Sequence, residues 1–406
     1  MFKKFGKMTT GILIGIILTI GIYGIVPHAV TAADLPRGLP FTPMQLAIFK
    51  QTKAMLEGYQ VDGDKDGTID DTKMFHGAMK GMVESVGDPY TRFVTPKDLE
   101  EEQISMEGEY GGLGIYIANR DGRTVVVAPI EDTPADKVGV KPLDEIIKVE
   151  DENVVGKQSD EVVKLLRGEP GKAVKITVRR KDKVKDDYEM IDFTIVREII
   201  KIKSVRMEMD GTIAYIKINS FNFKTNEEFA EALKTAKEKK ATGLLLDVRN
   251  NPGGILDSVV DVASQLIDGG VVVSMAGRVE SANSTLYAKS GIATDLPLVI
   301  LTNEGSASAS EILAGAIKDR QRGLVVGMKT FGKGSVQTLF NLPDKSGIYV
   351  TIARYMTPSG FEIDHKGLEP NVRMGGEPNR NRKEDKQYIK GMAVLKKEIE
   401  ARKKAQ

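Results

Sequence analysis

Three serines lie close together where the sequence changes from a strand pattern to a helix pattern: Ser306, Ser308 and Ser310. The apolar run 297–301 before them predicts a strand, and the spacing of the apolar residues after them predicts a helix. The start of a helix offers unpaired backbone N–H groups and the positive end of the helix dipole, which stabilise developing negative charge. A hydroxyl at this point can act as a nucleophile, although serines at a helix start also serve as caps.

A nucleophilic serine needs a general base, and the best candidate is Lys333, which lies between two glycines. The only histidines are His28, His76 and His365, so the sequence offers few candidates for the histidine of a Ser-His-Asp triad. A lysine can act as a base if burial or a neighbouring dipole lowers its pKa toward neutrality. Gln337, four residues later, could hold the amine in place. The alternative is a solvated loop lysine.

Two glycine-rich stretches resemble nucleotide-binding loops but lack essential parts. The segment 327–333 nearly matches a phosphate-binding loop, yet Gly334 stands where that motif needs Ser or Thr to hold magnesium. The stretch 112–114 lacks the third glycine and the following helix of a dinucleotide-binding loop. We therefore predict no cofactor.

Composition excludes further classes of function. Lys and Arg (58) nearly balance Asp and Glu (57), so no overall charge argues for a nucleic-acid partner. The absence of cysteine excludes a thiol nucleophile and a thiolate metal site, and it is compatible with an exported protein. The 406 residues suffice for two or three domains.

Residues 1–33 have the pattern of an export segment. Lysines near the start precede an apolar run at 11–26, and small residues follow at 29–33. This order fits a signal peptide. The run is long for a signal and short for a membrane span, so an uncleaved membrane anchor is equally compatible. Either way, we expect the remainder of the chain to lie outside the cytoplasm, secreted or anchored to the cell membrane.

Residues 34–102 have helical periodicity and form a predicted N-terminal helical segment. Within it, the stretch 62–70 matches the first nine positions of a calcium loop. Position twelve is Lys73 instead of the bidentate glutamate, which removes the strongest ligand. A solvated turn with a helix cap explains the stretch more simply, so we assign no metal.

Residues 103–183 contain a glycine-rich loop followed by alternating strand and helix patterns. This order resembles a PDZ domain, which binds an extended peptide as an added strand. The resemblance implies that the loop binds the terminal carboxylate through backbone N–H groups; it consists of Gly112, Leu113, Gly114 and Ile115. Arg167, at a predicted helix end, is either a partner of the helix dipole or a sensor that couples peptide binding to the active site.

Residues 184–375 alternate apolar strands with an amphipathic helix, which predicts an α/β domain. A Pro-Gly-Gly turn at 252–254 follows one buried strand, and its glycines allow the backbone to approach a substrate carbonyl closely. Residues 376–406 form a charged helical tail, which we expect to pack on another element or on a second copy of the chain in a homodimer.

The segment 306–337 resembles the signature of the carboxyl-terminal processing peptidases, serine proteases with a Ser-Lys dyad. The sequences Asp-Pro-Tyr-Thr at 88–91 and Thr-Pro-Ser-Gly at 357–360 resemble two further segments of that family. The resemblance implies that Ser308 is the nucleophile, Lys333 its base and Gln337 the residue that orients the lysine. It also implies an oxyanion hole formed by the N–H groups of Ala309 and of Gly253 or Gly254.

The same resemblance implies an α/β fold: a ClpP/crotonase-like α/β catalytic domain with an inserted PDZ domain and an N-terminal helical segment. The implied function is a serine-type endopeptidase that cleaves exported proteins or peptides with free C-termini through an acyl-enzyme. Two alternatives stay open. One is an acyl-transfer or acyl-CoA enzyme of related fold, and the other is a catalytically idle PDZ scaffold.

Overall fold

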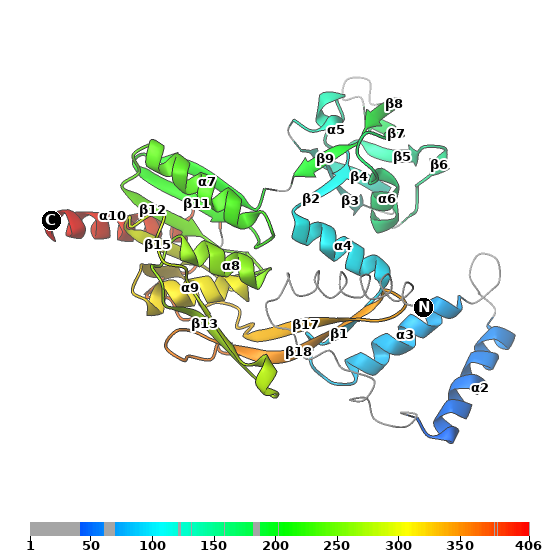
Figure 1. The fold of residues 1–406 in the computed structure, drawn as a ribbon. Coiled ribbons are helices and arrows are strands. Elements are labelled where there is room, and N and C mark those ends of the chain that lie inside the picture. The colour runs from blue at the N-terminus through cyan, green and yellow to red at the C-terminus, as the bar shows by residue number, and fades with distance from the viewer. Residues whose placement is uncertain are drawn as a thin grey trace, which may run out of the picture. The chain divides into compact units, whose positions relative to one another are not determined.

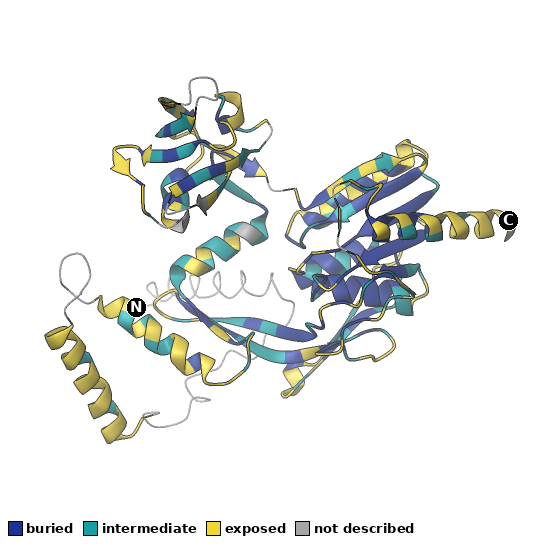
Figure 2. Cartoon of the chain, turned by 180° about the vertical axis from the view of Figure 1, so that it is seen from behind, coloured by how far each residue is buried: buried dark blue, intermediate teal, exposed yellow. Residues whose placement is uncertain are grey.

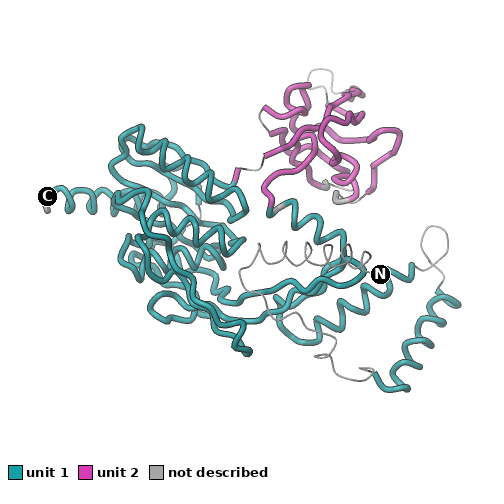
Figure 3. Tube along the Cα trace, in the orientation of Figure 1, with its two compact units in different colours: residues 1–106, 204–406 teal, residues 107–203 magenta. Residues whose placement is uncertain are grey.

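The computed structural model describes residues 41–60, 70–120, 123–130, 132–157, 159–181, 187–201, 203–376, 378–379 and 381–405. The chain forms two compact units, unit 1 (residues 1–106 and 204–406) and unit 2 (residues 107–203) (Figure 3). The predicted export segment at 1–33 and residues 62–69 of the calcium-like stretch lie outside the described residues. In the described ranges, no helix has both the length and the apolar character needed to span a membrane.

Unit 1 contains a six-stranded sheet with the order β10-β11-β12-β15-β16-β19 (Figure 1). All neighbouring strands pair in parallel except β10, which is antiparallel to β11. Every residue of β12 and β15 is buried, as expected for central strands of a parallel sheet that is covered on both faces (Figure 2). The strands are β10 (Val205–Asp210), β11 (Ile213–Ile218), β12 (Gly243–Asp247), β15 (Leu298–Thr302), β16 (Leu324–Gly327) and β19 (Val372–Arg373).

Helices cover the two faces of this sheet because successive side chains of a strand point to opposite sides. Leu244 and Leu246 join an apolar cluster with α7, α8 and α9, whereas Leu245 joins a second cluster with α10. A Cβ on Gly391 of α10 would lie 2.6 Å from a methyl group of Leu301, so glycine permits this close packing. The helices are α7 (Thr225–Glu238), α8 (Leu256–Ser264), α9 (Ala309–Asp319) and α10 (Lys386–Ala405).

A second sheet of unit 1 is antiparallel, with the order β1-β18-β13-β14 and with β17 also paired to β18. It joins the segment before residue 95 to strands from the C-terminal half of the chain. The elements are β1 (Arg92–Val94), β13 (Val271–Gly277), η1 (Glu280–Ala282), β14 (Ser284–Tyr287), β17 (Ser335–Asn341) and β18 (Gly347–Met356).

The predicted N-terminal helical segment contains α2 (Pro43–Tyr59), α3 (Asp71–Glu84) and α4 (Pro96–Glu107). Thr42 and Gln45 form a capping box at the start of α2, and Asp70 caps α3 by accepting from two backbone N–H groups. No residue of α2 is buried.

Unit 2 has a sheet with the order β3-β4-β5-β7-β8 and a short β2-β9 pair. The predicted boundary at residue 183 falls within the β7-β8 hairpin, which unit 2 contains whole, because β8 pairs with β7 along its full length. The elements are β2 (Glu109–Gly112), β3 (Ile115–Arg120), β4 (Arg123–Pro129), α5 (Pro134–Lys137), β5 (Glu145–Val149), β6 (Glu152–Asn153), α6 (Ser159–Leu166), β7 (Ala173–Lys181), β8 (Tyr188–Val196) and β9 (Glu198–Lys201).

Candidate active site

Ser308 lies between the carboxyl end of β15 and the start of α9, in a backbone conformation that is rare for a residue with a side chain. Its φ is 53° and its ψ is −113°. Hydrogen bonds hold the turn in place: the N–H of Ser308 donates to the Glu311 carboxylate (2.9 Å), and the N–H of Ala307 donates to the carbonyl of Asn251 (3.0 Å). The turn therefore presents the Ser308 side chain at the end of a buried strand.

The two neighbouring serines have structural roles. The hydroxyl of Ser306 donates to the carbonyl of Val248 (2.8 Å), and the hydroxyl of Ser310 donates to the carbonyl of Asn251 (3.0 Å). Both serines are fully buried, whereas Ser308 is half-buried. Of the three, only Ser308 lines the cavity of about 240 Å³ at this site.

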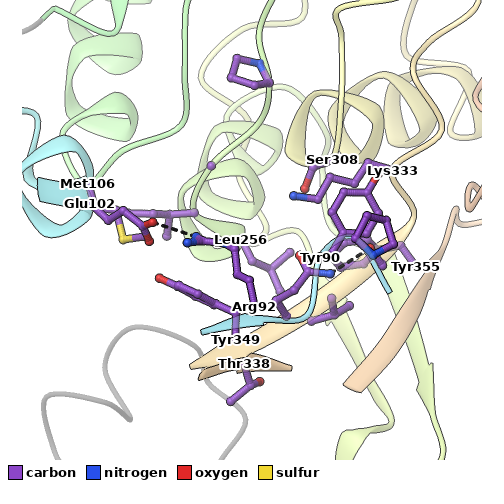
Figure 4. Close-up of a pocket in the computed structure, with 17 residues that line it drawn as sticks. Tyr90, Arg92, Glu102, Met106, Leu256, Ser308, Lys333, Thr338, Tyr349 and Tyr355 are labelled. Carbon is purple, nitrogen blue, oxygen red and sulfur yellow. Dashed lines mark hydrogen bonds and ion pairs between the residues drawn. The ribbon is translucent and has the colours of Figure 1, made fainter. Parts of the chain in front are cut away.

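The same cavity brings together residues that are far apart in the sequence. Lys333 and Gln337 line it with Ser308, and Gly254 contributes from the turn after β12. In Figure 4 the side chain of Lys333 extends toward Ser308. His76 and His365 are not among the residues that line this cavity.

The surroundings of Lys333 favour its neutral form. Burial lowers the pKa of the Lys333 amine, the nearby charge of Arg92 lowers it further, and the charge of Glu311 opposes this effect. The amine lies 4.8 Å from the centre of the Tyr90 ring. Arg92 is held over the ring of Tyr349 and forms an ion pair with Glu102 at 2.8 Å.

Glu311 connects the serine turn to the lysine loop, a role that we did not infer from the sequence. One carboxylate oxygen accepts from the N–H groups of Ser308 and Lys333, both at 2.9 Å. The other accepts from the Thr330 hydroxyl and from the N–H of Gly332 at 2.8 Å. The spacing Ser308-x-x-Glu311 is that of a capping box, which is the sequence signal that could have revealed it.

The predicted oxyanion donors differ in their availability. The N–H of Gly253 donates to the side chain of Asn251 (2.9 Å), so it is already used in this structure. Gly254 lines the cavity, and Ala309 is the first residue of α9, where N–H groups have no acceptor within the helix. A Cβ on Gly253 would lie 2.8 Å from the Cβ of Ser308. The turn thus passes directly beside the serine.

Gln337 lies on β17 opposite Thr351 of β18, next to a shift in the register of the two strands. Its side-chain nitrogen donates to the hydroxyls of Ser335 (2.9 Å) and Thr351 (3.1 Å). These bonds fix the amide within the cavity wall.

A buried ionic network lies at the end of β12, and it too was not inferred from the sequence. The guanidinium of Arg249 pairs with Asp247 at 2.7 Å and with Asp385 at 2.9 Å. All three side chains are at most 2% exposed. Asp385 directly precedes α10, so the network ties this helix to the strand that leads into the glycine turn. No group of three or more acidic or histidine side chains suited to a metal occurs among the described residues.

In unit 2, the predicted peptide-binding residues 112–115 join β2 to β3, and β3 is an outer strand of its sheet. Gly114 has a φ of 76°, and a Cβ there would lie 2.3 Å from Thr133. The carbonyl of Leu113 accepts from the N–H of Ala135 (3.0 Å), which fixes the loop. The guanidinium of Arg167 lies 4.9 Å from the centre of the Tyr110 ring.

Comparisons with known proteins agree with this arrangement. The model of peptidase family S41 matches residues 212–374, and a PDZ domain model matches residues 111–186. The chain is 38% identical over 308 residues to a carboxy-terminal-processing protease of Bartonella bacilliformis, covering 75% of this chain and 70% of that protein. It is 35% identical over 363 residues to a probable CtpA-like serine protease of Staphylococcus epidermidis, and the match covers 89% of this chain and 72% of that protein.

A solved photosystem II D1 C-terminal processing protease is 30% identical, with a TM-score of 0.46, and the match covers 80% of this chain and 86% of that one. The family models and the relatives define the class as a serine-type peptidase with a PDZ domain. The chain belongs to peptidase family S41, among the carboxy-terminal-processing proteases.

Proposed function

We propose that this peptidase cleaves exported proteins or peptides with free C-termini, and that Ser308 and Lys333 form its catalytic dyad. The observation that carries the proposal is the shared cavity, in which the Lys333 side chain extends toward Ser308 and has a lowered pKa (Figure 4). A neutral lysine can take the serine proton at the moment of attack.

In the proposed mechanism, Lys333 accepts the proton of Ser308 as the serine oxygen attacks the scissile carbonyl. The N–H groups of Ala309 and Gly254 stabilise the resulting oxyanion, and α9 adds the positive end of its dipole. Lys333 then gives its proton to the leaving amine, and water resolves the acyl-enzyme. We prefer Gly254 to Gly253 because the N–H of Gly253 already donates to Asn251.

Unit 2 is the proposed substrate-recognition module. Its outer strand β3 can accept an extended peptide, and the loop 112–115 can bind the terminal carboxylate through backbone N–H groups. Arg167 is a proposed regulatory residue, since its contact with Tyr110 places it close to the strand that leads into this loop. The extracytoplasmic location, the membrane anchor and a homodimer stay predictions from the sequence.

A serine-reactive phosphonate tests the nucleophile. We expect it to label the wild-type chain and Ser310→Ala but not Ser308→Ala, and we expect Ser308→Ala to lose cleavage of a disordered substrate. Ser310→Ala is the matched control because its hydroxyl only holds the turn; it should cost about 1 kcal/mol of stability. Labelling that survives in Ser308→Ala would refute the assignment. Labelling without peptide cleavage would favour another acyl-transfer activity.

A further inference from the structure

The turn at 88–91 (Asp-Pro-Tyr-Thr) precedes β1 and brings Tyr90 to the candidate active site. Tyr90 lines the cavity together with Ser308 and Lys333 (Figure 4). The Lys333 amine lies over the Tyr90 ring, 4.8 Å from its centre. This distance is within the roughly 6 Å over which the face of an aromatic ring attracts a cation. The ring therefore lies next to the atom that takes up charge in the proposed mechanism.

Hydrogen bonds hold the backbone that carries this ring. The N–H of Tyr90 donates to the Asp88 carboxylate (3.1 Å), and the hydroxyl of Thr91 donates to the same carboxylate (2.6 Å). The Thr91 hydroxyl in turn accepts from the N–H of Thr351 on β18 (3.1 Å). The backbone at Tyr90 is thus held both by its own turn and by a strand of the antiparallel sheet.

The ring and the other surroundings of Lys333 act on different protonation states of the amine. Burial and the charge of Arg92 favour the neutral amine that must be present before attack, and the charge of Glu311 opposes them. The ring quadrupole attracts a full positive charge, so it stabilises an ammonium far more than a neutral amine. An interaction that strengthens as the reaction proceeds accelerates the chemical step.

We propose that the Tyr90 ring stabilises the positive charge that forms on Lys333 when its amine accepts the Ser308 proton. In that step the O–H bond of Ser308 breaks and its proton moves to the amine nitrogen. The serine oxygen uses the freed electron pair to bond to the scissile carbonyl carbon. Tyr90 is a positioning residue because it acts through Lys333. This role rests on the proposed dyad and deepens it.

Two variants separate the ring from its hydroxyl, because Tyr90→Phe keeps the ring face and Tyr90→Leu removes it. We expect Tyr90→Phe to keep kcat within about twofold. Tyr90→Leu should lower kcat about fivefold to thirtyfold, which is the rate equivalent of a cation–π contact in a largely desolvated site. The acid limb of its kcat/KM profile should move to lower pH, because the lysine ammonium of the free enzyme loses the ring.

The direction of this movement distinguishes the ring's charge effect from simple shielding. If the ring only kept water away from Lys333, its loss would hydrate the ammonium, raise the lysine pKa and move the acid limb to higher pH. Phenylalanines with one, two and three ring fluorines, incorporated at position 90, weaken the negative ring face at nearly constant shape. We expect kcat to fall and the acid limb to move to lower pH with each added fluorine.

The matched control is Phe361→Leu, which removes a ring that lies 5.9 Å from the Lys366 amine. Neither residue of this pair lines the cavity, so the variant should keep the wild-type kcat and acid limb. All these variants leave the titratable groups around the ring and the amine in place: Asp88, Arg92, Glu102, Glu311, Tyr355 and Asp364.

The outcomes separate the role of the ring from the dyad itself. If Lys333→Ala is inactive but Tyr90→Leu keeps the wild-type kcat and acid limb, the role of Tyr90 is refuted and the dyad stands. Equal losses in Tyr90→Phe and Tyr90→Leu would assign the effect to the hydroxyl and also overturn it. A fluorinated series with constant kcat and acid limb would do the same, even if Tyr90→Leu failed to fold. If Lys333→Ala remains active, the proposed dyad fails first.

Discussion

Unit 1 contains two largely buried basic side chains whose surroundings have opposite effects. Burial lowers the pKa of Arg249, but the hydrogen bonds that its guanidinium donates to Asp247 and Asp385 raise it above the usual value. Burial likewise opposes the charge of Lys333, and the charge of Arg92 lowers the pKa further. The carboxylate of Glu311 raises the pKa of Lys333, and its oxygens accept from backbone N–H groups and a hydroxyl.

Under the proposed mechanism, one unit uses a buried basic side chain for structure at one place and for chemistry at another. Two carboxylates compensate Arg249, so it remains charged and holds elements together. Burial and the charge of Arg92 lower the pKa of Lys333, and the carboxylate of Glu311, which opposes them, already accepts hydrogen bonds from other groups. The presence of paired carboxylates, and not burial alone, distinguishes the charged Arg249 from Lys333.

The largest expected effect comes from making Lys333 resemble Arg249. Lys333→Arg keeps the positive charge but places a guanidinium that proteins do not deprotonate where a base is needed. We expect kcat/KM for a disordered substrate to fall by about 10³-fold or more. The matched control is Lys329→Arg, a half-exposed lysine in the same loop, which should keep its activity. An active Lys333→Arg would show that the lysine is no base.

A second prediction removes the paired cation. Arg249→Met leaves Asp247 and Asp385 as uncompensated buried charges, and breaking such a network costs about 3–5 kcal/mol. Denaturant unfolding of the full chain measures this loss. Lys289→Met, which breaks an exposed pair with Asp261, should change stability by less than about 1 kcal/mol. Equal losses in the two variants would contradict the comparison.

The smallest effect concerns stability and its pH dependence. The folded pKa of Lys333 lies below its usual value, so the unfolded chain binds more protons between the two pKa values. The lysine therefore costs stability below its folded pKa, and the cost disappears as pH rises past the unfolded value of about 10.4. Lys333→Met should raise the unfolding temperature at neutral pH, and the gain should shrink at alkaline pH. A pH-independent gain would argue against the lowered pKa.

Much of the fold could be predicted because hydrophobic periodicity follows local rules. The strand predicted at 297–301 is confirmed as β15 within one residue at each end, and the helix predicted next to the three serines is confirmed as α9. The end of unit 2 was harder to predict from the sequence. The strand β8 is largely exposed, and its pairing with β7 and the packing of Ile195 in the core assign it to this unit.

The candidate site residues could be predicted from the sequence for a different reason. Ser308 and Lys333 lie in a stretch whose resemblance to a known signature is long, and the structure places both at one cavity. The capping-box spacing could have revealed the contact of Glu311 with Ser308, but its contacts with the lysine loop arise only when the chain folds. The role of Arg249 arises entirely from such contacts. Arg249 pairs with a carboxylate 136 residues away, and no local pattern reports such a pair.

The link between Arg249 and Asp385 also bears on the order in which the enzyme is completed during synthesis. The ribosome makes the strand β12 and its glycine turn long before it makes the segment that begins α10. Until residue 385 has emerged, Arg249 lacks its second carboxylate and the sheet face under α10 is bare. The ionic network and the helix that support the strand beside the candidate active site are therefore completed late in synthesis.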